Sequence, residues 1–361
     1  MLGIIRFFLA SCVIVFHLSL QVPHIGLLAV NFFYVISGYL ITMILNDSYR
    51  FNFKSFALNR FLRLYPTYFF FSAISIAFSV TYISGHTSSP FHPSWSGHYQ
   101  PFDLIANIFL FPWEILNDYG ILSFFSNPYV PSEAARFRWI PSSWSVAVEI
   151  ICYVILWAFT ARNFFSALIT LAAAIVINAL VGHFNLNPLY RYSPFFAAML
   201  PFSLGALSYF LVKANDHRKH LFEILDRYQL VTLIFIVALF TVNWYFASKQ
   251  WGVALFSSIA YYTNNLIACL AVIIFHKTQP KGFYDKICKF IGDLSYPIFI
   301  SQYLGGYIAW IMLGSPIQNR GWEVFFYGYA VTLAMSILSV LIIDGPIKKV
   351  RNIIRPKKVV P

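Results

Sequence analysis

Long apolar runs, separated by shorter polar connections, fill the chain from its first residues to about residue 343. A run of roughly 17–25 apolar residues is long enough to cross the hydrocarbon core of a bilayer as one helix. Ten segments have this character: 4–22, 26–46, 66–84, 144–161, 164–183, 194–213, 229–247, 251–275, 290–312 and 323–343. The pattern predicts an all-α fold, a polytopic membrane helix bundle with about ten transmembrane helices.

Two connections differ from the short ones. The connection at 50–65, RFNFKSFALNRFLRLY, mixes basic residues with Phe and Leu, which predicts an amphipathic helix lying on the cytoplasmic face of the membrane. The stretch at 85–143 is the only sizeable gap between apolar runs and is rich in Pro, Ser, Trp and His. It predicts an extracytoplasmic loop that folds as a cap. With no repeat or linker visible, residues 1–361 are interpreted as a single domain.

Composition agrees with a membrane protein. The chain is 59% hydrophobic and only 11% charged, whereas a soluble domain carries about 25% charged residues. A net charge of +12 could suit nucleic acid, but the basic residues gather in short connections and in the tail, so no nucleic-acid partner is expected. The four cysteines are scattered without CxxC spacing, so neither a disulfide nor a zinc site is predicted.

The distribution of basic residues sets the orientation. An even number of spans puts both ends of the chain on one side, together with most of the 25 lysines and arginines. The basic residues in connections on the opposite side are Arg136, Arg138, Arg191, Lys249 and Arg320. By the positive-inside rule both termini are cytoplasmic, and 347–361 is a basic cytoplasmic tail. The first run is then a retained signal-anchor helix.

The first run, MLGIIRFFLASCVIVFHLSL, holds two residues that are costly inside a membrane, Arg6 and His17. The interval between them turns a helix by about 1100°, three turns and about 20°, so both side chains share one face, with a rise of roughly 16 Å. His17 would lie roughly 7 Å below the outer surface, where an ionisable group usually faces a cavity and marks a functional site. A histidine bonded to a neighbouring helix is the alternative, and Arg6 alone could reach lipid phosphates.

Glu149, in PSSWSVAVEI, is the second intramembrane candidate. Its helix runs inward, so Glu149 also lies about five residues below the outer surface, near the depth of His17. A carboxylate beside an imidazole can select its tautomer and stabilise the imidazolium, as an acid–base catalyst requires. A plain buried hydrogen bond is the alternative.

Arg60 and Arg63 lie three positions apart and share a helix face. Two such arginines can grip a phosphate, with lipid headgroups as the alternative ligand. His86, His92 and His98 invite a metal interpretation, but their even spacing matches no standard site, and no metal is expected.

Five stretches together resemble the acyltransferase-3 family of integral membrane acyltransferases. Arg6, ten residues and then His17 resemble the family's first-helix hallmark; FFYVISGYLIT resembles its second-helix signature and NRFLRLYP its Arg-x-x-Arg element. PSSWSVAVEIICY resembles its Trp-Ser-Leu-x-x-Glu-x-x-Phe-Tyr stretch, with Glu149 as the acid. GDLSYPIFISQY resembles a Ser-Tyr-x-x-Tyr-x-x-His pattern, although this chain has Phe299 and Gln302 there.

The resemblance implies an O-acetyltransferase without a fused C-terminal hydrolase-like domain, in the inner membrane of a bacterium. It would move an acetyl group, or another acyl group, from cytoplasmic acetyl-CoA or acyl-CoA to a hydroxyl of a cell-surface polysaccharide or lipid-linked glycan. We expect Arg6, Arg60 and Arg63 to hold the phosphates of the donor. His17 would remove the acceptor proton with support from Glu149, either in direct transfer or through an acetyl-histidine intermediate.

Two other classes of function compete with this hypothesis. A glycan or lipid transporter, or a flippase, also uses intramembrane charges, but the sequence shows no inverted repeat or paired broken helices. A membrane sensor or scaffold would not need a buried histidine and a glutamate at matching depth.

Overall fold

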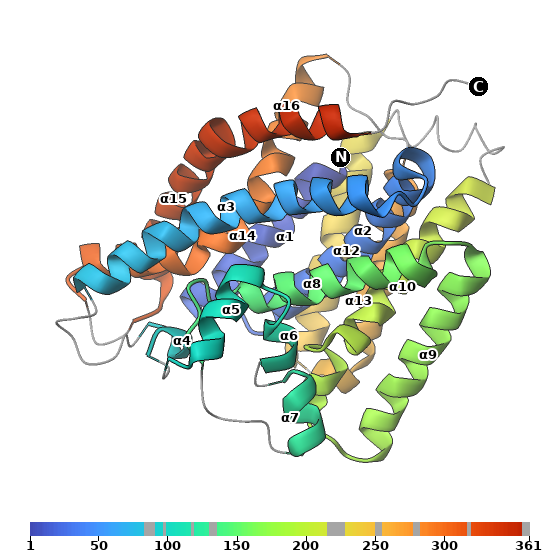
Figure 1. Ribbon diagram of the computed structural model, residues 1–361, viewed down its shortest axis with the longest axis horizontal. Helices are drawn as coiled ribbons and strands as arrows, with labels where there is room; N and C mark the ends of the chain where they lie inside the picture. Colours follow the sequence, from blue (N-terminus) through green and yellow to red (C-terminus); the bar gives the residue numbers. More distant parts are fainter. Residues whose placement is uncertain are drawn as a thin grey trace. The chain divides into compact units, whose positions relative to one another are not determined.

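The computed structural model describes residues 1–82, 91–96, 99–116, 119–129, 136–214, 228–249, 255–276, 282–315 and 319–355. Helices make up most of this part of the chain (Figure 1). The long helices are α1 (Leu2–Ser19), α2 (Ile25–Ile44), α3 (Phe53–Tyr82), α8 (Ser143–Ile155), α9 (Phe164–His183), α10 (Phe195–Ala214), α12 (Gln229–Lys249), α13 (Ile259–Ile274), α14 (Phe283–Met312) and α15 (Trp322–Ser339). Three of them continue into π-helical turns, α2 into η1 (Leu45–Tyr49), α8 into η3 (Leu156–Thr160) and α15 into η6 (Val340–Asp344), and α16 (Gly345–Ile354) follows η6.

Each of the ten apolar segments predicted from the sequence contains helix. Within the described residues, eight helical stretches are long and apolar enough to cross a membrane: Leu2–Ser19, Ile25–Tyr49, Phe53–Phe78, Ser143–Thr160, Phe164–His183, Pro188–Ala214, Gln229–Lys249 and Trp322–Ile354. The other two segments contain the shorter apolar helix α13 and most of α14. The all-α polytopic bundle is therefore confirmed, while the number ten and the cytoplasmic termini stay predictions.

The helix predicted at 50–65 is confirmed from residue 53 onward, while its position on the cytoplasmic face stays a prediction. Residues 53–65 are helical, but they form the first half of α3, which continues without a break through Pro66. A proline has no N–H for the helix ladder, but packed membrane helices tolerate it where neighbouring groups satisfy the released carbonyl. This half of α3 buries Phe56 and Asn59 and packs against α16.

α16 has the surface character that was expected of 50–65. It contains no buried residue and combines Lys348, Lys349 and Arg351 with Ile and Val side chains. The first part of the predicted basic tail at 347–361 is therefore helical, and residues 356–361 lie outside the described residues.

The predicted cap region, 85–143, folds into short helices in its described parts. They are α4 (Pro93–Ser96), α5 (Pro101–Phe109), α6 (Trp113–Leu116) and α7 (Ile121–Ser126). The buried carboxylate of Asp103, in the first turn of α5, accepts from Arg136 Nε at 2.7 Å. The Tyr68 hydroxyl on α3 donates to the Asn107 carbonyl at 2.7 Å, which ties this region to α3. That it caps the outer face stays a prediction.

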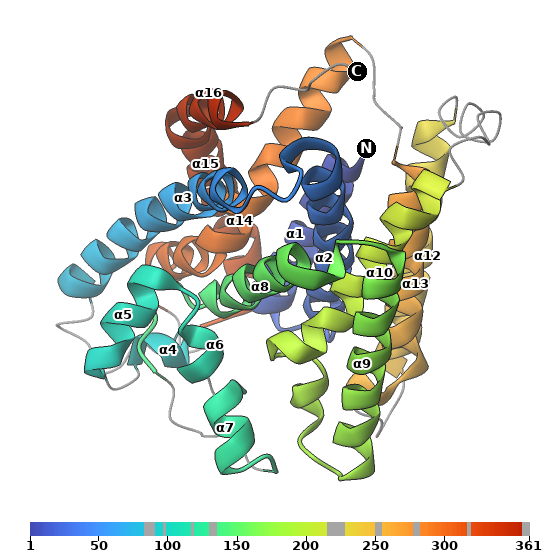
Figure 2. The same cartoon turned by 45° about the vertical axis from the view of Figure 1, so that its right-hand side comes forward.

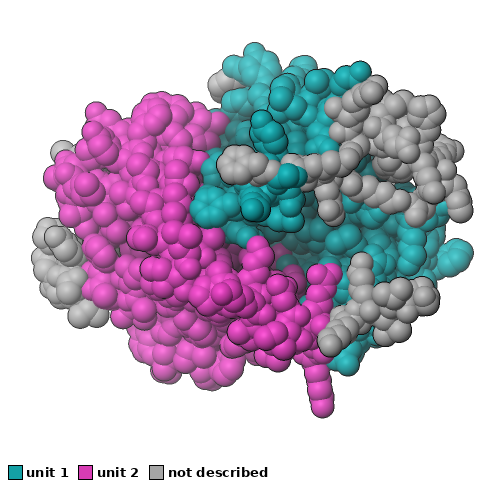
Figure 3. Space-filling model, turned by 90° about the horizontal axis from the view of Figure 1, so that it is seen from above, with its two compact units in different colours: residues 1–13, 23–52, 152–295 teal, residues 14–22, 53–151, 296–361 magenta. Residues whose placement is uncertain are grey.

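The chain divides into two compact units, which Figure 3 shows in separate colours. Unit 1 comprises 1–13, 23–52 and 152–295, and unit 2 comprises 14–22, 53–151 and 296–361. Each unit draws on segments that lie far apart in the sequence. The interpretation of 1–361 as one domain stays a prediction.

Unit 1 is built around α2, which packs along α10 and α13, while α9 packs on α10 (Figures 1 and 2). Two glycines allow α2 and α10 to approach closely. A Cβ on Gly38 would collide with the backbone of Phe202, and a Cβ on Gly205 would collide with the Val35 carbonyl. Small residues at such crossings are typical of helix packing in membranes.

In unit 2 the last turn of α1 lies against α14 and α15. The Gly321 N–H donates to the Leu18 carbonyl at 2.9 Å. A Cβ on Gly306 or on Gly328 would collide with the Leu18 side chain, so both glycines make room for it. This packing positions the C-terminal end of α1 for the contacts described next.

Candidate active site

His17 lies near the end of α1, on the same continuous helix as Arg6, as the spacing predicted. Its ring is half-buried, and Nδ1 lies 2.6 Å from the hydroxyl oxygen of Tyr303 on α14, a direct hydrogen bond. The two ring centroids are 4.8 Å apart. The buried Tyr303 therefore determines the orientation of the imidazole and leaves Nε2 for other partners.

A second histidine, His92, packs on the other side of this pair. Its ring meets the Tyr303 ring edge-on at a centroid distance of 4.6 Å. His92 Nδ1 accepts from the Ser94 N–H at 3.0 Å, so the neutral ring carries its proton on Nε2. Burial, and then the positive charges of Arg138 and Arg320, hold the pKa of His92 well below its ordinary value of 6.5. His92 is therefore neutral at physiological pH.

Two arginines flank these rings. The Arg320 guanidinium lies 5.7 Å from the centre of the Tyr303 ring, and its Nη2 donates to the Phe91 carbonyl at 2.6 Å. Its Nε is buried without a hydrogen-bond partner among the described residues. Burial lowers the pKa of Arg320 below its ordinary value, yet an arginine keeps its charge in a protein. The buried Arg138 lies over the Trp113 ring at 5.6 Å. The two histidines therefore lie in an environment of aromatic rings and positively charged guanidinium groups.

Glu149 is half-buried on α8 and belongs to the same unit. Its negative charge and the positive charge of Arg63 both act on the hydroxyl of Tyr296, which donates to the Leu64 carbonyl at 2.9 Å. Tyr296 precedes Tyr303 by two turns of α14, about 10 Å along the helix. Glu149 and Arg63 are therefore close enough to Tyr296 to act on it electrostatically, whereas His17 Nδ1 is hydrogen-bonded to Tyr303. Direct support of His17 by Glu149 stays a prediction.

Arg60 lies in a second cluster, with Asn59 and Arg351. The Asn59 side-chain oxygen accepts from Arg60 Nη2 at 3.3 Å and from Arg351 Nε at 3.2 Å, and its amide donates to the Arg351 carbonyl at 3.0 Å. A neutral amide holds the two cations together without cancelling their charge. Arg60 Nε is buried without a hydrogen-bond partner in the described part of the chain. Such a pair fits a phosphate group.

The other predicted residues have mixed outcomes. Arg6 belongs to unit 1, whereas Arg60 and Arg63 belong to unit 2, so a shared phosphate site stays a prediction. His86 and His98 lie outside the described residues. Among the residues that the structure describes, no group of three or more His, Cys, Asp or Glu side chains could hold a metal ion.

Sequence reasoning missed Tyr303, Arg320 and Arg351 and treated His92 only as a possible metal ligand. The signal for Tyr303 was its position directly after Gln302, in the stretch where the acyltransferase-3 pattern places polar residues. Arg320 was visible as one of the few cations on the side that the positive-inside rule leaves poor in basic residues. Arg351 had no distinguishing signal within the basic tail.

No curated protein and no solved structure matches the chain. A family model described as an acyltransferase domain, that of acyltransferase-3, matches residues 2–344. Because the match covers nearly the whole chain, the protein belongs to the acyltransferase-3 family of membrane acyltransferases.

Proposed function

We propose that this acyltransferase moves an acetyl group from cytoplasmic acetyl-CoA to a hydroxyl of a cell-surface polysaccharide or its lipid-linked precursor. The observation that carries the proposal is the hydrogen bond between His17 and Tyr303 beside the Arg320 guanidinium. It places an oriented imidazole and a fixed positive charge together, which acyl transfer to an alcohol requires.

The tautomer of His17 follows from the role of a general base. For Nε2 to take a proton, Nδ1 must carry the ring hydrogen and donate it to the Tyr303 oxygen. Tyr303 is then a positioning residue that keeps Nε2 available as an acceptor. With the hydrogen bond in the other direction, Nε2 would carry the hydrogen and could act only as an acid.

In the proposed reaction the acceptor oxygen attacks the carbonyl carbon of the thioester while His17 Nε2 takes the hydroxyl proton. The tetrahedral oxyanion develops near Arg320, whose charge stabilises it. The C–S bond then breaks, and the sulfur leaves with the proton from His17 as free CoA. In the alternative route the acetyl group first forms a bond to Nε2 of His17 and then passes to the acceptor.

The cytoplasmic donor would be held by the second cluster. Positive charge gathers at the N-terminal half of α3, from Arg60, Arg63 and the neighbouring Arg351. The predicted orientation places this half of α3 at the cytoplasmic surface. Acetyl-CoA presents phosphates at one end and the thioester at the other, so its pantetheine arm would extend from this cluster toward His17. Arg6 would add a further phosphate contact.

The test compares His17→Ala with His24→Asn in inverted membrane vesicles supplied with acetyl-CoA. His24 lies just beyond α1 in a left-handed backbone conformation (φ 64°), which Asn accepts, so it is the matched control. We expect His17→Ala to lower CoA release by about 10²–10⁴-fold and to remove the O-acetyl signal from the cell-surface glycan in NMR spectra. His24→Asn should stay within about twofold of wild type.

Acetylation at the wild-type rate in a correctly inserted His17→Ala protein would remove the catalytic assignment. Movement of a glycan across the membrane without consumption of acetyl-CoA would favour the flippase alternative.

A further inference from the structure

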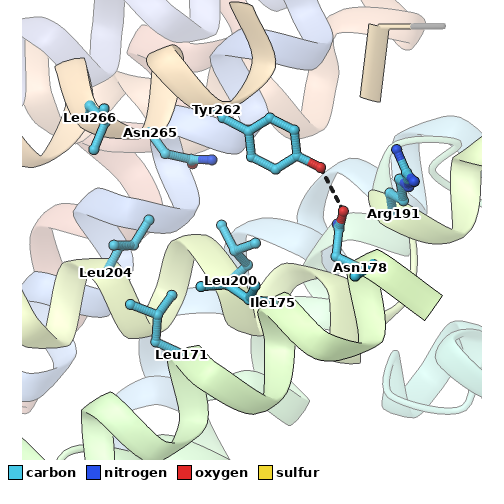
Figure 4. Close-up of a pocket in the computed structure, with 10 residues that line it drawn as sticks. Leu171, Ile175, Asn178, Arg191, Leu200, Leu204, Tyr262, Asn265 and Leu266 are labelled. Atoms are coloured by element: carbon cyan, nitrogen blue, oxygen red, sulfur yellow. Dashed lines mark hydrogen bonds between the residues drawn. The ribbon is translucent and has the colours of Figure 1, made fainter. Parts of the chain in front are cut away.

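A cavity of about 410 Å³ lies within unit 1, between α9, α10, α13 and the short helix η4 (Pro188–Arg191) (Figure 4). This volume lies within the range of small-molecule sites, roughly 300–1,000 Å³. Asn178, Arg191 and the Tyr262 hydroxyl gather at one end of the cavity, and Leu204 and Leu266 lie at the other, with Asn265 beside them (Figure 4). The ligand that fits must therefore combine a polar group with a hydrocarbon chain.

The polar end contains hydrogen-bonding groups that the protein does not satisfy. The Tyr262 hydroxyl donates to Asn178 Oδ1 at 2.6 Å, which leaves the amide nitrogen of Asn178 buried without a partner among the described residues. Farther along the cavity, beside Leu266, the Asn265 Oδ1 is also without a partner in the described part of the chain (Figure 4). Asn178 is only 6% exposed and Asn265 only 1%. Buried polar groups are normally bonded, so these two amides indicate a missing ligand.

Arg191 supplies a positive charge at the same end (Figure 4). Its Nη1 donates to the Ser257 hydroxyl at 2.7 Å and to the Phe256 carbonyl at 3.5 Å, both of which are neutral acceptors. The other terminal nitrogen lies against Gly182, where a Cβ would collide with it. The guanidinium is therefore held in place by groups that do not cancel its charge, and an anion is the ligand that it fits.

Apart from Asn265, the opposite end and the rim of the cavity are apolar. Leu171, Leu200 and Leu204 line the inner part. Ile175 and Leu266 also line it, although 51% and 63% of their respective surfaces are exposed, so they form its rim. These residues lie on α9 and α10, which are membrane-spanning candidates, and on the apolar helix α13. The entrance therefore opens to hydrocarbon, and the ligand arrives from the bilayer.

We infer that this cavity binds a phosphate-bearing lipid. The phosphate lies on Arg191 and accepts from the amide nitrogen of Asn178, and a hydrocarbon chain follows the leucines for about 10 Å, the rise from Asn178 to Leu171 along α9. In the predicted orientation the polar end faces the extracytoplasmic side, so the lipid belongs to the outer leaflet. All of these residues belong to unit 1, whereas His17 belongs to unit 2, so the inference is independent of the proposed catalytic role of His17.

The experiment measures lipid binding by native mass spectrometry on the delipidated full-length protein in detergent. The probes are phosphatidylglycerol, a polyprenyl phosphate, diacylglycerol and inorganic phosphate. We expect a lipid phosphate to bind at least tenfold more tightly than diacylglycerol, and millimolar inorganic phosphate not to displace it. Preference for the polyprenyl phosphate would identify a lipid carrier as the ligand, and preference for phosphatidylglycerol a membrane phospholipid; either supports the site.

Two variants and one control locate the binding. Arg191→Gln removes the positive charge from the cavity. Gly182→Ala displaces the guanidinium but keeps its charge, and alanine favours the α9 helix more than glycine does. The second variant therefore still tests the site if Arg191→Gln folds poorly. Both should weaken lipid-phosphate binding at least tenfold. Lys249→Gln removes an exposed cation at the end of α12, outside the cavity, and should leave binding unchanged.

The inference would be overturned by diacylglycerol binding as tightly as the lipid phosphates, or by wild-type binding in both cavity variants. An equal loss of lipid binding in Lys249→Gln would overturn the inference as well, because that result would show that surface charge in general attracts the lipid phosphate.

Discussion

Substitution of Tyr303 by Phe removes one oxygen atom from the candidate active site. That oxygen lies 2.6 Å from His17 Nδ1. The ring itself remains, with its edge-on contact to His92 at 4.6 Å and the Arg320 guanidinium at 5.7 Å. The variant therefore tests the hydrogen bond separately from the packing.

The size of the effect follows from the burial of the pair. Removing one partner of a buried hydrogen bond costs about 1–3 kcal/mol. If Tyr303 selects the catalytic tautomer of His17, this free energy is lost from the transition state, which corresponds to roughly a 5- to 150-fold fall in kcat. The donor phosphates bind elsewhere, so the KM for acetyl-CoA should change less than twofold. The free energy of unfolding should fall by a similar amount, about 1–3 kcal/mol.

The assay follows CoA release in inverted vesicles at varied acetyl-CoA concentration, with thermal unfolding measured on the purified protein in detergent. Tyr68→Phe is the matched control, because Tyr68 is equally buried in the same unit and donates to the Asn107 carbonyl at 2.7 Å. It should lose similar stability and retain its kcat. If Tyr303→Phe keeps the wild-type kcat, or if Tyr68→Phe loses activity to the same extent, the positioning role of Tyr303 is wrong.

Three further predictions concern the rest of unit 2. Arg60→Gln and Arg63→Gln should each raise the KM for acetyl-CoA about tenfold at constant kcat, because each loses about 1.4 kcal/mol of phosphate binding. The KM for S-acetyl-pantetheine, which lacks the nucleotide phosphates, should not change. An equal rise in KM with both donors would favour a lipid-headgroup role for these arginines. His92 stays neutral when folded but binds a proton below pH 6.5 when unfolded, so the unfolding free energy should fall with decreasing pH by up to about 1.4 kcal/mol per pH unit. His92→Asn keeps an acceptor at the start of α4 and should lose this slope in thermal unfolding at pH 7.5, 6.5 and 5.5; identical slopes would contradict the neutral assignment. Asp103→Asn removes the negative charge that Arg136 contacts at 2.7 Å, and the free energy of unfolding should fall by about 1.5–3 kcal/mol in the same measurement. An unchanged unfolding free energy would show that this ion pair contributes little to stability.

The apolar pattern alone determined the class of fold. A membrane offers the backbone no hydrogen bonds, so each long apolar run must close its own hydrogen bonds as a helix, and this requirement is local. The shared face of Arg6 and His17 followed in the same way, since positions along one helix depend only on sequence spacing. The local pattern did not show that 53–82 forms one helix, which continues through Pro66 and packs against α16.

Only the tertiary structure decided which side chains meet. Tyr303 is separated from His17 by 286 positions and Arg351 from Asn59 by 292, and neither pair leaves a periodic signal in the sequence. Depth counting placed Glu149 near the level of His17 but could not say which face of α8 turns toward which neighbour; in the structure its charge is one of several that act on Tyr296. Depth along a membrane helix is fixed by the number of residues, whereas the partner across a helix interface depends on how the helices pack.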